Sequence, residues 1–279
     1  MIKNLIILCS ALWFGITSPA LAQRSQVSDS GYYLTLNKDF ILSGFTDARD
    51  VLIAPAKWSK HEWLGVAAFA GTSVLLYTQD EIIRDFFQRN QTPALDNISK
   101  YALEPWGSGV YLVPFVAGMY VYGLTRKNQD AETAALLTGK AVVITGAFTL
   151  LIKGITGRHR PNQDVPADPA LWEGPFHSFD YISFPSGHTA VVFSAATMLS
   201  SYYHEKTWVA ITSYSLASLV GVSRIYDDKH WATDVLTGAA LGFAIGKLVY
   251  NNYRKKNKFV VLPYQSGSFQ GVSVQFRVN

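Results

Sequence analysis

Six apolar stretches limit what this chain can fold into, because each is rich in Ala, Val, Leu and Gly. They are 15–19 residues long, slightly shorter than the roughly 20 residues that cross a bilayer. Their small residues allow close helix packing in a membrane. The pattern predicts an all-α bundle of six membrane-embedded helices, with a soluble bundle as the alternative. The stretches lie at 63–78, 108–125, 134–152, 189–203, 208–222 and 233–250.

The remaining segments are more polar. Residues 79–106 and 154–187 are expected to be the two long loops between helices. After the basic segment "YRKKNK", the sequence "FVVLPYQSGSFQGVSVQFRVN" contains β-branched and aromatic residues, a central Ser-Gly and an alternating end. This pattern predicts a short C-terminal β-hairpin, with a disordered tail as the alternative.

The first residues have the features of a secretory signal. Lys3 gives a positive start, "LIILCSALWFGI" an apolar middle, and Ala20-Leu21-Ala22 a small-residue cleavage site. We therefore expect a signal peptide at 1–22, with an uncleaved membrane anchor as the alternative. Cys9 is the only cysteine, so the mature chain would have no disulfide, thiolate nucleophile or cysteine-bound metal. Such a chain suits an oxidising compartment such as a periplasm.

Charge is low and unevenly placed. The net charge is +4, and no basic stripe with interleaved aromatic residues is present, so nucleic-acid binding is not expected. The positive-inside rule predicts that the basic connections are cytoplasmic and that 154–187 and 223–232 face outward. A cleaved signal peptide would put the mature N-terminus outside, and six membrane crossings from there would reverse this sidedness. We therefore predict that 63–78 is interfacial or re-entrant, and the number of crossings is left open. The basic connections are 126–127, 206 and 254–258.

The segment "KGITGRHRP", which follows the third apolar stretch, contains Lys153 and Arg160. Lys153 and Arg160 are seven residues apart, which predicts that they share a helical face, and Pro161 is expected to end the helix. Two cations at this place favour a bound anion. Snorkelling of both side chains to the membrane surface is the alternative.

The segment Pro185-Ser186-Gly187-His188 opens the fourth apolar stretch. Ser186 is a favourable N-cap residue, and Gly187 allows the backbone to approach a ligand closely. The first turn of a helix has free N–H groups and a positive dipole end, which favour phosphate. A capped helix without a ligand is the alternative.

The third polar group is "SRIYDDKHWATD", with Arg224, His230 and Asp234. If His230 begins a helix, Asp234 lies one turn later on the same face. Its carboxylate then fixes the histidine tautomer and leaves the other ring nitrogen as a nucleophile. An alternating bundle places all three groups on one side. Together they predict a site for a tetrahedral oxyanion with histidine as nucleophile and acid.

These residues form three ordered blocks, and in them the sequence resembles the type 2 phosphatidic acid phosphatase (PAP2) family, which shares its fold with vanadium haloperoxidases. The family pattern is Lys, six residues, Arg-Pro; Pro-Ser-Gly-His; and Ser-Arg, five residues, His, three residues, Asp. Every fixed position matches, and the resemblance covers roughly 60–245. The matching residues are Lys153, Arg160, Pro161, Pro185, Ser186, Gly187, His188, Ser223, Arg224, His230 and Asp234.

The resemblance implies a role for each of these residues. His230 would attack phosphorus and form a phosphohistidine, Asp234 would orient it, and His188 would protonate the leaving oxygen and later activate water. No metal or other cofactor is implied, because three cations supply the positive charge. The phosphate-binding residues would be Lys153, Arg160, Ser186, Gly187 and Arg224.

The resemblance also implies a function: a phosphatase of a lipid phosphate or diphosphate, with undecaprenyl diphosphate as the first candidate. The alternatives are a soluble periplasmic nonspecific acid phosphatase and, less favoured, a vanadate-dependent haloperoxidase. The expected partners are the lipid substrate and membrane lipids, without nucleic acid or an obligate protein partner. The expected location is the bacterial inner membrane, multi-pass, with the active site facing the periplasm.

The sequence thus divides into four predicted segments. The signal peptide is followed by a periplasmic or interfacial segment at 23–60, a PAP2 phosphatase domain at 61–252, and a basic linker with the β-like tail at 253–279.

A few other polar residues are not assigned to the site. His159 is expected to be a loop histidine, and Lys140 to snorkel or pair with a helix carbonyl. Asp227 and Asp228 are expected to be solvated loop carboxylates.

Overall fold

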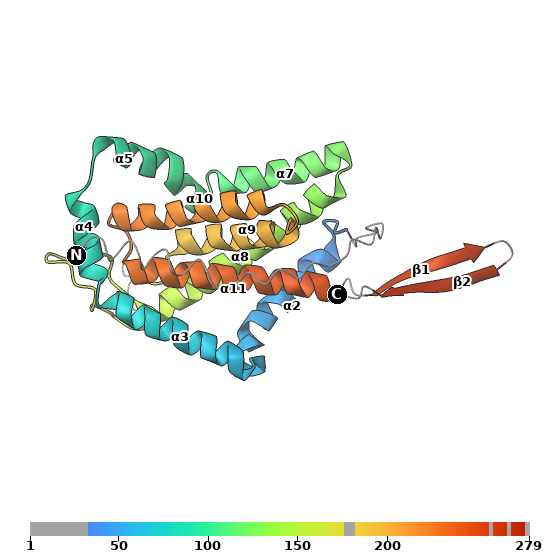
Figure 1. The fold of residues 1–279 in the computed structure, drawn as a ribbon, viewed down its shortest axis with the longest axis horizontal. Helices are drawn as coiled ribbons and strands as arrows, with labels where there is room; N and C mark the ends of the chain where they lie inside the picture. Colours follow the sequence, from blue (N-terminus) through green and yellow to red (C-terminus); the bar gives the residue numbers. More distant parts are fainter. Residues whose placement is uncertain (1–32, 176–181, 257–258, 267–268, 277–279) are drawn as a thin grey trace. The chain divides into compact units, whose positions relative to one another are not determined.

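The computed structural model describes residues 33–175, 182–256, 259–266 and 269–276, and these residues are mainly helical (Figure 1). The predicted signal peptide at 1–22 lies outside the described residues. The predicted hairpin is present: β1 (Phe259–Ser266) pairs antiparallel with β2 (Phe269–Phe276).

All six apolar stretches form helices. An additional helix, α2 (Lys38–Ile53), begins at the N-cap Asn37, whose side chain accepts a hydrogen bond from Phe40 N at 2.8 Å. It packs against α8 and α11. The six predicted helices are α3 (Lys60–Tyr77), α7 (Leu112–Arg126), α8 (Gln129–Thr156), α9 (Gly187–Tyr202), α10 (Thr207–Tyr226) and α11 (Ala232–Lys256).

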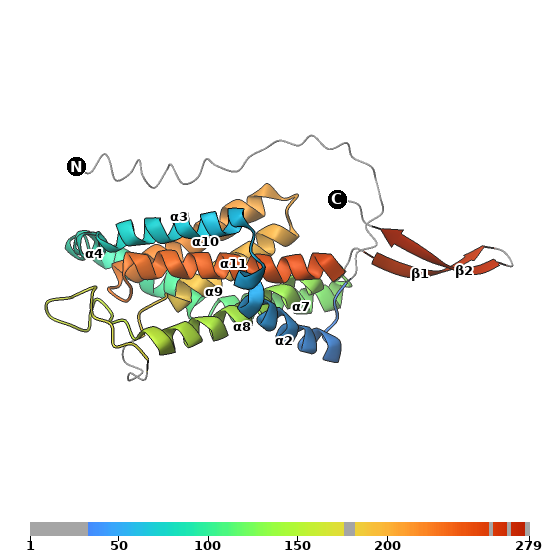
Figure 2. The same cartoon turned by 90° about the horizontal axis from the view of Figure 1, so that it is seen from below.

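Helix α9 is the centre of the bundle and packs against α8, α10 and α11, which run alongside one another in Figures 1 and 2. Glycines recur every fourth residue on α11, at Gly238, Gly242 and Gly246. A Cβ atom at Gly242 would lie 2.1 Å from the carbonyl oxygen of Ala190 on α9. No larger residue fits there, so these glycines allow the two backbones to touch.

Aliphatic side chains fill the bundle beside this contact. Leu137, Met198, Ile245 and Val249 come from α8, α9 and α11 and are almost completely buried. Their close packing stabilises the contacts between these helices through dispersion. The polar residues of the three sequence blocks lie at the ends of these same helices, so the packed core fixes their separation.

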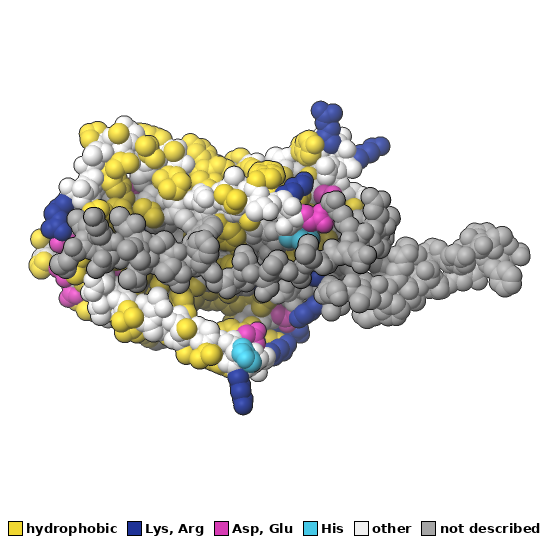
Figure 3. All heavy atoms as spheres, in the orientation of Figure 1, with side chains coloured by type: hydrophobic (Ala, Val, Ile, Leu, Met, Phe, Trp, Pro, Cys, Tyr) yellow, Lys and Arg dark blue, Asp and Glu magenta, His cyan; other side chains and the backbone are white. Residues whose placement is uncertain are grey.

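The outer faces of the helices are apolar and exposed. Val143 and Leu150 on α8 expose 71% and 67% of their surface, and Trp208 on α10 exposes 65%. Hydrophobic side chains cover much of the helical face in Figure 3. Exposed apolar surface of this extent marks a region that contacts something other than water.

Within the part of the chain that is described, α8, α10 and α11 are long and apolar enough to cross a membrane. A fourth crossing is counted if the helices of 93–107 and α7, bent by 54°, form one broken span. Helices α3 and α9 do not reach the same limits. The interfacial or re-entrant placement of 63–78 stays a prediction.

The expectation of a loop at 79–106 was wrong. The segment forms α4 (Asp80–Arg89), α5 (Pro93–Asn97), a π-helical turn (Ile98–Leu103) and α6 (Glu104–Gly107). We call residues 80–107 the cap segment. Its helices are short and interrupted by two prolines, which hides their periodicity in the sequence.

The cap segment is attached to the end of α10 by polar contacts. Arg84 binds Asp228 through two hydrogen bonds, at 2.7 and 2.8 Å, and Ser99 donates to Asp227 at 2.7 Å. The expectation that Asp227 and Asp228 are solvated was therefore wrong, because each carboxylate has a partner on the cap segment. These contacts hold the segment against the end of the bundle that carries the sequence blocks.

Lys140 also differs from its expectation. Its ammonium lies 2.6 Å from an oxygen of Asp47 on α2 and donates to Ser43 at 3.0 Å. Both charged side chains are almost fully buried. Lys140 therefore fastens α2 to α8 and does not snorkel.

Candidate active site

The three sequence blocks meet where α8 ends and where α9 and α11 begin. The N–H of Ser186, before α9, donates to the carbonyl oxygen of Asp234 on α11 at 3.0 Å. A Cβ atom at Gly187 would lie 3.8 Å from Cε of Lys153 on α8. The glycines of α11 allow this convergence, since Gly238 packs directly on the carbonyl of Ser186.

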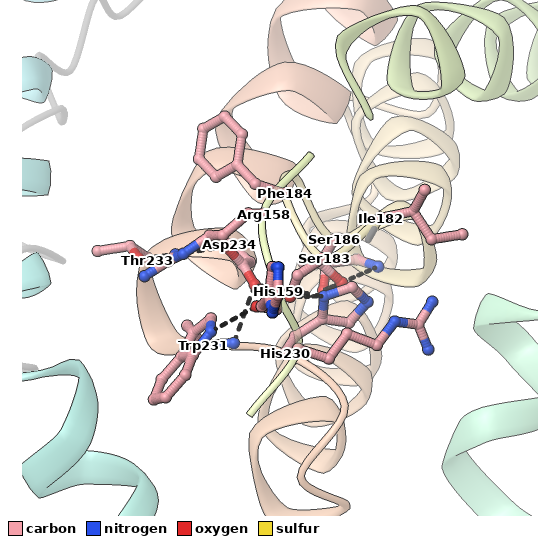
Figure 4. A network of polar contacts seen from close by, with 12 residues as sticks. Arg158, His159, Ile182, Ser183, Phe184, Ser186, His230, Trp231, Thr233 and Asp234 are labelled. Atoms are coloured by element: carbon pink, nitrogen blue, oxygen red, sulfur yellow. Dashed lines mark hydrogen bonds and ion pairs between the residues drawn. The ribbon is translucent and has the colours of Figure 1, made fainter. Parts of the chain in front are cut away.

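His230 and Asp234 form a buried pair at the start of α11, as the sequence predicted (Figure 4). The distance from His230 Nδ1 to Asp234 Oδ2 is 3.5 Å. The same carboxylate oxygen accepts from Ser183 Oγ at 2.5 Å and from the N–H of Trp231 at 3.0 Å. Nδ1 thus faces the carboxylate, and Nε2 is the ring nitrogen that points away from it.

Burial lowers the pKa of His230 to about 3, and Asp234 opposes this change. The positive charges of Lys153 and Arg160 add to the lowering, so both cations act on the imidazole. A neutral ring has a free lone pair at neutral pH. The site therefore keeps His230 in the form that a nucleophile needs.

Ser186 caps α9 as expected. Its Oγ accepts from Thr189 N at 3.4 Å and from Thr189 Oγ1 at 2.9 Å. The N–H groups of Gly187 and His188 are the first two of the helix and have no intrahelical acceptor. They are donors suited to an anion at the positive end of the helix dipole.

Lys153 and Arg160 do not share a helical face, contrary to the prediction. Helix α8 ends at Thr156 because Gly157 adopts a left-handed conformation, with φ of 62°, four residues before Pro161. Lys153 donates to the carbonyl oxygens of Ile182 and Ser183, the latter at 3.2 Å. The loop after α8 carries Arg160 back toward the site.

Arg160 is a partly buried cation at the same site. Its Nε is buried and donates no hydrogen bond within the part of the chain that is described. Burial lowers the pKa of Arg160, Asp234 opposes that change, and the charge of Arg224 adds to it. Arg224 is itself bonded to Asp227. A buried guanidinium beside another cation is stabilised by a bound anion.

His188 contacts a carboxylate that the sequence did not reveal. Its Nε2 lies 3.1 Å from Oε1 of Glu104 in the cap segment. Both side chains are about one-third exposed. A Cβ atom at Gly107 would lie 2.6 Å from Cβ of His188, so α6 approaches this histidine at backbone distance.

Arg158 is the second residue that the sequence reasoning missed. Its guanidinium is fully buried and donates to Asp234 Oδ1 at 2.6 Å (Figure 4). It donates to Asp80 Oδ2 as well, at 2.8 Å. It also donates to Thr233 Oγ1 at 2.7 Å, and Thr233 N donates to Asp80 Oδ1 at 2.9 Å. Arg158 therefore holds the carboxylate that faces His230.

Aromatic rings enclose the same guanidinium. The rings of Tyr77, Trp172 and Trp231 lie 5.1, 4.9 and 5.5 Å from its central carbon. Burial raises the pKa of Asp80, although Thr233 and Arg158 oppose the change. The sequence signal for Arg158 was its place in "GRHRP", two residues before Arg160. Asp80 and Glu104 had no comparable signal.

His159 is a loop residue, as expected, but it is buried. Its Nδ1 lies 2.8 Å from Asp164 and its Nε2 lies 3.0 Å from Glu173. Burial lowers the pKa of His159, but the two carboxylates outweigh it and the pKa is raised. The carbonyl of His159 accepts from Trp231 Nε1 at 2.9 Å. These contacts close the loop that carries Arg160.

The described residues contain no group of three or more His, Cys, Asp or Glu that could hold a metal ion. Lys153, Arg160 and Arg224 bring positive charge to the site. Two histidines, three cations and a helix N-terminus thus converge at the end of a helical bundle with an apolar exterior. Fold and site together define a helical membrane protein with a polar, cationic site at one end of its bundle.

The chain belongs to the PAP2 superfamily, whose lipid phosphatases are phosphoric-ester hydrolases; the family model matches residues 134–258. It is 32% identical over 190 residues to a PA-phosphatase related-family protein of Dictyostelium discoideum, an alignment that covers 62% of this chain and 67% of that protein.

Two other proteins are also similar to this chain. Lipid A 1-phosphatase of Porphyromonas gingivalis is 32% identical over 142 residues, which are 50% of this chain but only 28% of that protein. A solved structure, the transmembrane PAP2-type phosphatidylglycerolphosphate phosphatase from Bacillus subtilis, has a TM-score of 0.46 and 24% identity, covering 78% of this chain and 95% of the other.

Proposed function

We propose that this chain is a metal-independent phosphatase that hydrolyses a lipid phosphate or diphosphate through a phosphohistidine intermediate. The observation that carries the proposal is the buried Nε of Arg160, which has no acceptor among the described residues. It lies near Arg224 and close enough to His230 for its charge to lower the histidine pKa. A phosphoryl group would supply the missing acceptor and neutralise the cations.

The proposed reaction has two steps. The Nε2 lone pair of His230 attacks phosphorus, and the bond from phosphorus to the leaving oxygen breaks. If the leaving oxygen is an alkoxide, it takes a proton from His188. Water then attacks the phosphohistidine, gives a proton to His188 and releases inorganic phosphate and free His230. Asp234 keeps the imidazole in one tautomer throughout.

Binding of the phosphoryl oxygens is assigned to the cations and to the first turn of α9. The charge in the transition state of phosphoryl transfer is spread over these oxygens, so fixed positive groups stabilise it without a metal. The groups are the side chains of Lys153, Arg160, Arg224 and Ser186 and the N–H of Gly187.

The lipid nature of the substrate is supported by the surface beside the site. Leu151 and Ile155 flank Lys153 on α8 and expose 57% and 63% of their surface. An acyl or prenyl chain would find an apolar path along α8, whereas a small soluble ester would not use it. Undecaprenyl diphosphate is the first candidate because an outward-facing site suits recycling of a lipid carrier.

The proposed location is the bacterial inner membrane, with the site facing the periplasm. The exposed apolar faces of α8 and α10 favour this over a soluble periplasmic acid phosphatase. The placement of Lys and Arg in the connections supports the orientation.

The test is phosphate release from a panel of lipid and water-soluble phosphate esters, with membrane and soluble fractions assayed separately. Release from lipids in the membrane fraction supports the proposal. Halide oxidation with added vanadate and no phosphate release would instead indicate a haloperoxidase.

The intermediate is tested by trapping acid-labile phosphate on the protein. His230→Ala should abolish both turnover and trapping. His188→Ala should reduce turnover but retain trapping from a substrate with a good leaving group. Equal trapping on the His230→Ala protein would show that another residue is the nucleophile.

A further inference from the structure

We propose that Glu104 sets the leaving-group preference of this site and makes it favour phosphate monoesters over diphosphates. The inference rests on the proposed function and narrows its substrate class. It ranks lipid monophosphates above undecaprenyl diphosphate.

The geometry places one carboxylate on the proposed general acid. Glu104 Oε1 lies 3.1 Å from His188 Nε2, and α6 holds the two residues together through the contact of Gly107 with the histidine. The other acids of the site are already engaged. Asp234 is bonded to Arg158 and Ser183, whereas His188 is the hydrogen-bond partner of the Glu104 carboxylate among the described residues.

The Glu104–His188 pair resembles the Asp234–His230 pair. In one pair, Asp234 faces Nδ1 of His230 and leaves Nε2 reactive. In the other, Glu104 holds Nε2 of His188 and leaves Nδ1 as the nitrogen that exchanges a proton. A carboxylate stabilises the imidazolium form, so Glu104 favours on His188 the proton that a leaving alkoxide requires.

Burial, and then the positive charges of Arg224 and Arg160, lower the pKa of His188 below its ordinary value. Glu104 is the group that opposes them. Without its charge, the imidazole would more often be neutral, and a poor leaving group would depart without a proton. Turnover of a monoester would then suffer most.

The two substrate classes differ in the bond that breaks. With a monoester, the phosphorus–oxygen bond to the lipid alcohol breaks, the electron pair goes to that oxygen, and the proton of His188 follows. With a diphosphate, the bridging bond breaks and the electron pair stays on the oxygen of the departing lipid monophosphate. That anion is stable without a proton, and its charge is repelled by Glu104.

The experiment compares two substrates that share one lipid: dioleoyl phosphatidic acid and dioleoylglycerol diphosphate, in mixed micelles with the full-length protein. Glu104→Gln should lower kcat/KM for the monoester by about a hundredfold, the range of a general acid. It should leave kcat/KM for the diphosphate unchanged or higher. Glu104→Asp, which retains the charge, should restore part of the monoester activity.

The ratio of the two kcat/KM values is the decisive readout. A general loss of folded protein or of phosphate affinity lowers both values by the same factor and leaves their ratio unchanged. Asp96→Asn is the matched control: Asp96 lies on the same cap segment and accepts from Tyr226 at 2.5 Å, away from His188. Its ratio should equal that of the wild type.

Two outcomes would overturn the inference. If Glu104→Gln lowers both activities equally, the residue is structural, and the proposed function stands. If the wild-type protein releases phosphate neither from these two lipids nor from any lipid of the panel, the proposed function fails and the inference fails with it.

Discussion

Replacing Arg158 with alanine should destabilise this protein more than any change at the exposed surface. The side chain is 1% exposed and pairs with two carboxylates, Asp80 and Asp234, that are 0% exposed. Removing one partner of a buried ion pair leaves an uncompensated charge in a medium that solvates it poorly. In this case two carboxylates lose the same cation.

The expected size follows from this burial. Breaking a buried ion pair costs about 3–5 kcal/mol, which corresponds to a fall in Tm of about 6–20 °C for a chain of this size. The loss of packing between Tyr77, Trp172 and Trp231 acts in the same direction. Arg158→Lys retains the charge but not the bidentate donor geometry, so its Tm should lie between those of the wild type and Arg158→Ala.

The assay is thermal unfolding of the detergent-solubilised protein, with phosphate release measured in parallel. Arg84→Ala is the matched control, because Arg84 also pairs with an aspartate, Asp228, but is 23% exposed. We expect a Tm change of only a few degrees for Arg84→Ala, since a partly exposed pair contributes about 1 kcal/mol or less.

A double substitution separates the charge effect from the packing effect. Asp80→Asn added to Arg158→Ala removes one of the two stranded charges and should recover several degrees of the lost Tm. The reasoning is refuted if Arg158→Ala changes Tm no more than Arg84→Ala. It is also refuted if the double variant is less stable than Arg158→Ala alone.

Three further predictions concern the site and its surroundings. Vanadate should inhibit competitively, because it mimics five-coordinate phosphorus, and EDTA should leave activity intact; complete loss in EDTA that Mg²⁺ restores would contradict the mechanism. Burial holds the pKa of folded His230 at about 3, below the ordinary value of about 6.5. The unfolded chain therefore binds more protons in this range, and stability should fall by about 1.4 kcal/mol per unit as pH drops from about 6.5 toward about 3. His230→Gln should flatten this slope, and an unchanged slope in a pH series of Tm values would contradict it. In a Cys9→Ser background, an impermeant maleimide on intact spheroplasts should label Ala170→Cys but not Lys256→Cys; the reverse would mean a cytoplasm-facing site, and labelling of both would favour a wholly periplasmic protein.

The sequence was sufficient for the features that depend on local pattern. The six long apolar stretches predicted α3 and α7–α11, because a run of apolar residues must bury or contact lipid wherever it lies. Ser186 predicted the start of α9, since an N-cap hydroxyl acts on the N–H groups of its own helix. The spacing of His230 and Asp234 predicted their contact for the same local reason.

Tertiary structure decided the parts of the site that come from distant segments. Asp80 reaches Arg158 across 78 residues, and Glu104 reaches His188 across 84. The cap segment that carries both acids consists of short, proline-interrupted helices without a clear period. No local rule relates such a segment to the histidines.

Local reasoning also failed where a neighbour changed the role of a charged residue. Lys140 and Asp228 were expected to reach solvent or membrane surface, but Asp47 and Arg84 meet them inside the protein. Sequence alone predicted which groups carry the chemistry, because those residues stand in fixed local blocks. Only the fold decided which acids stand beside them. A charged side chain pairs with the group that helix packing brings within a few ångströms, and the glycine contacts between α9 and α11 set that packing.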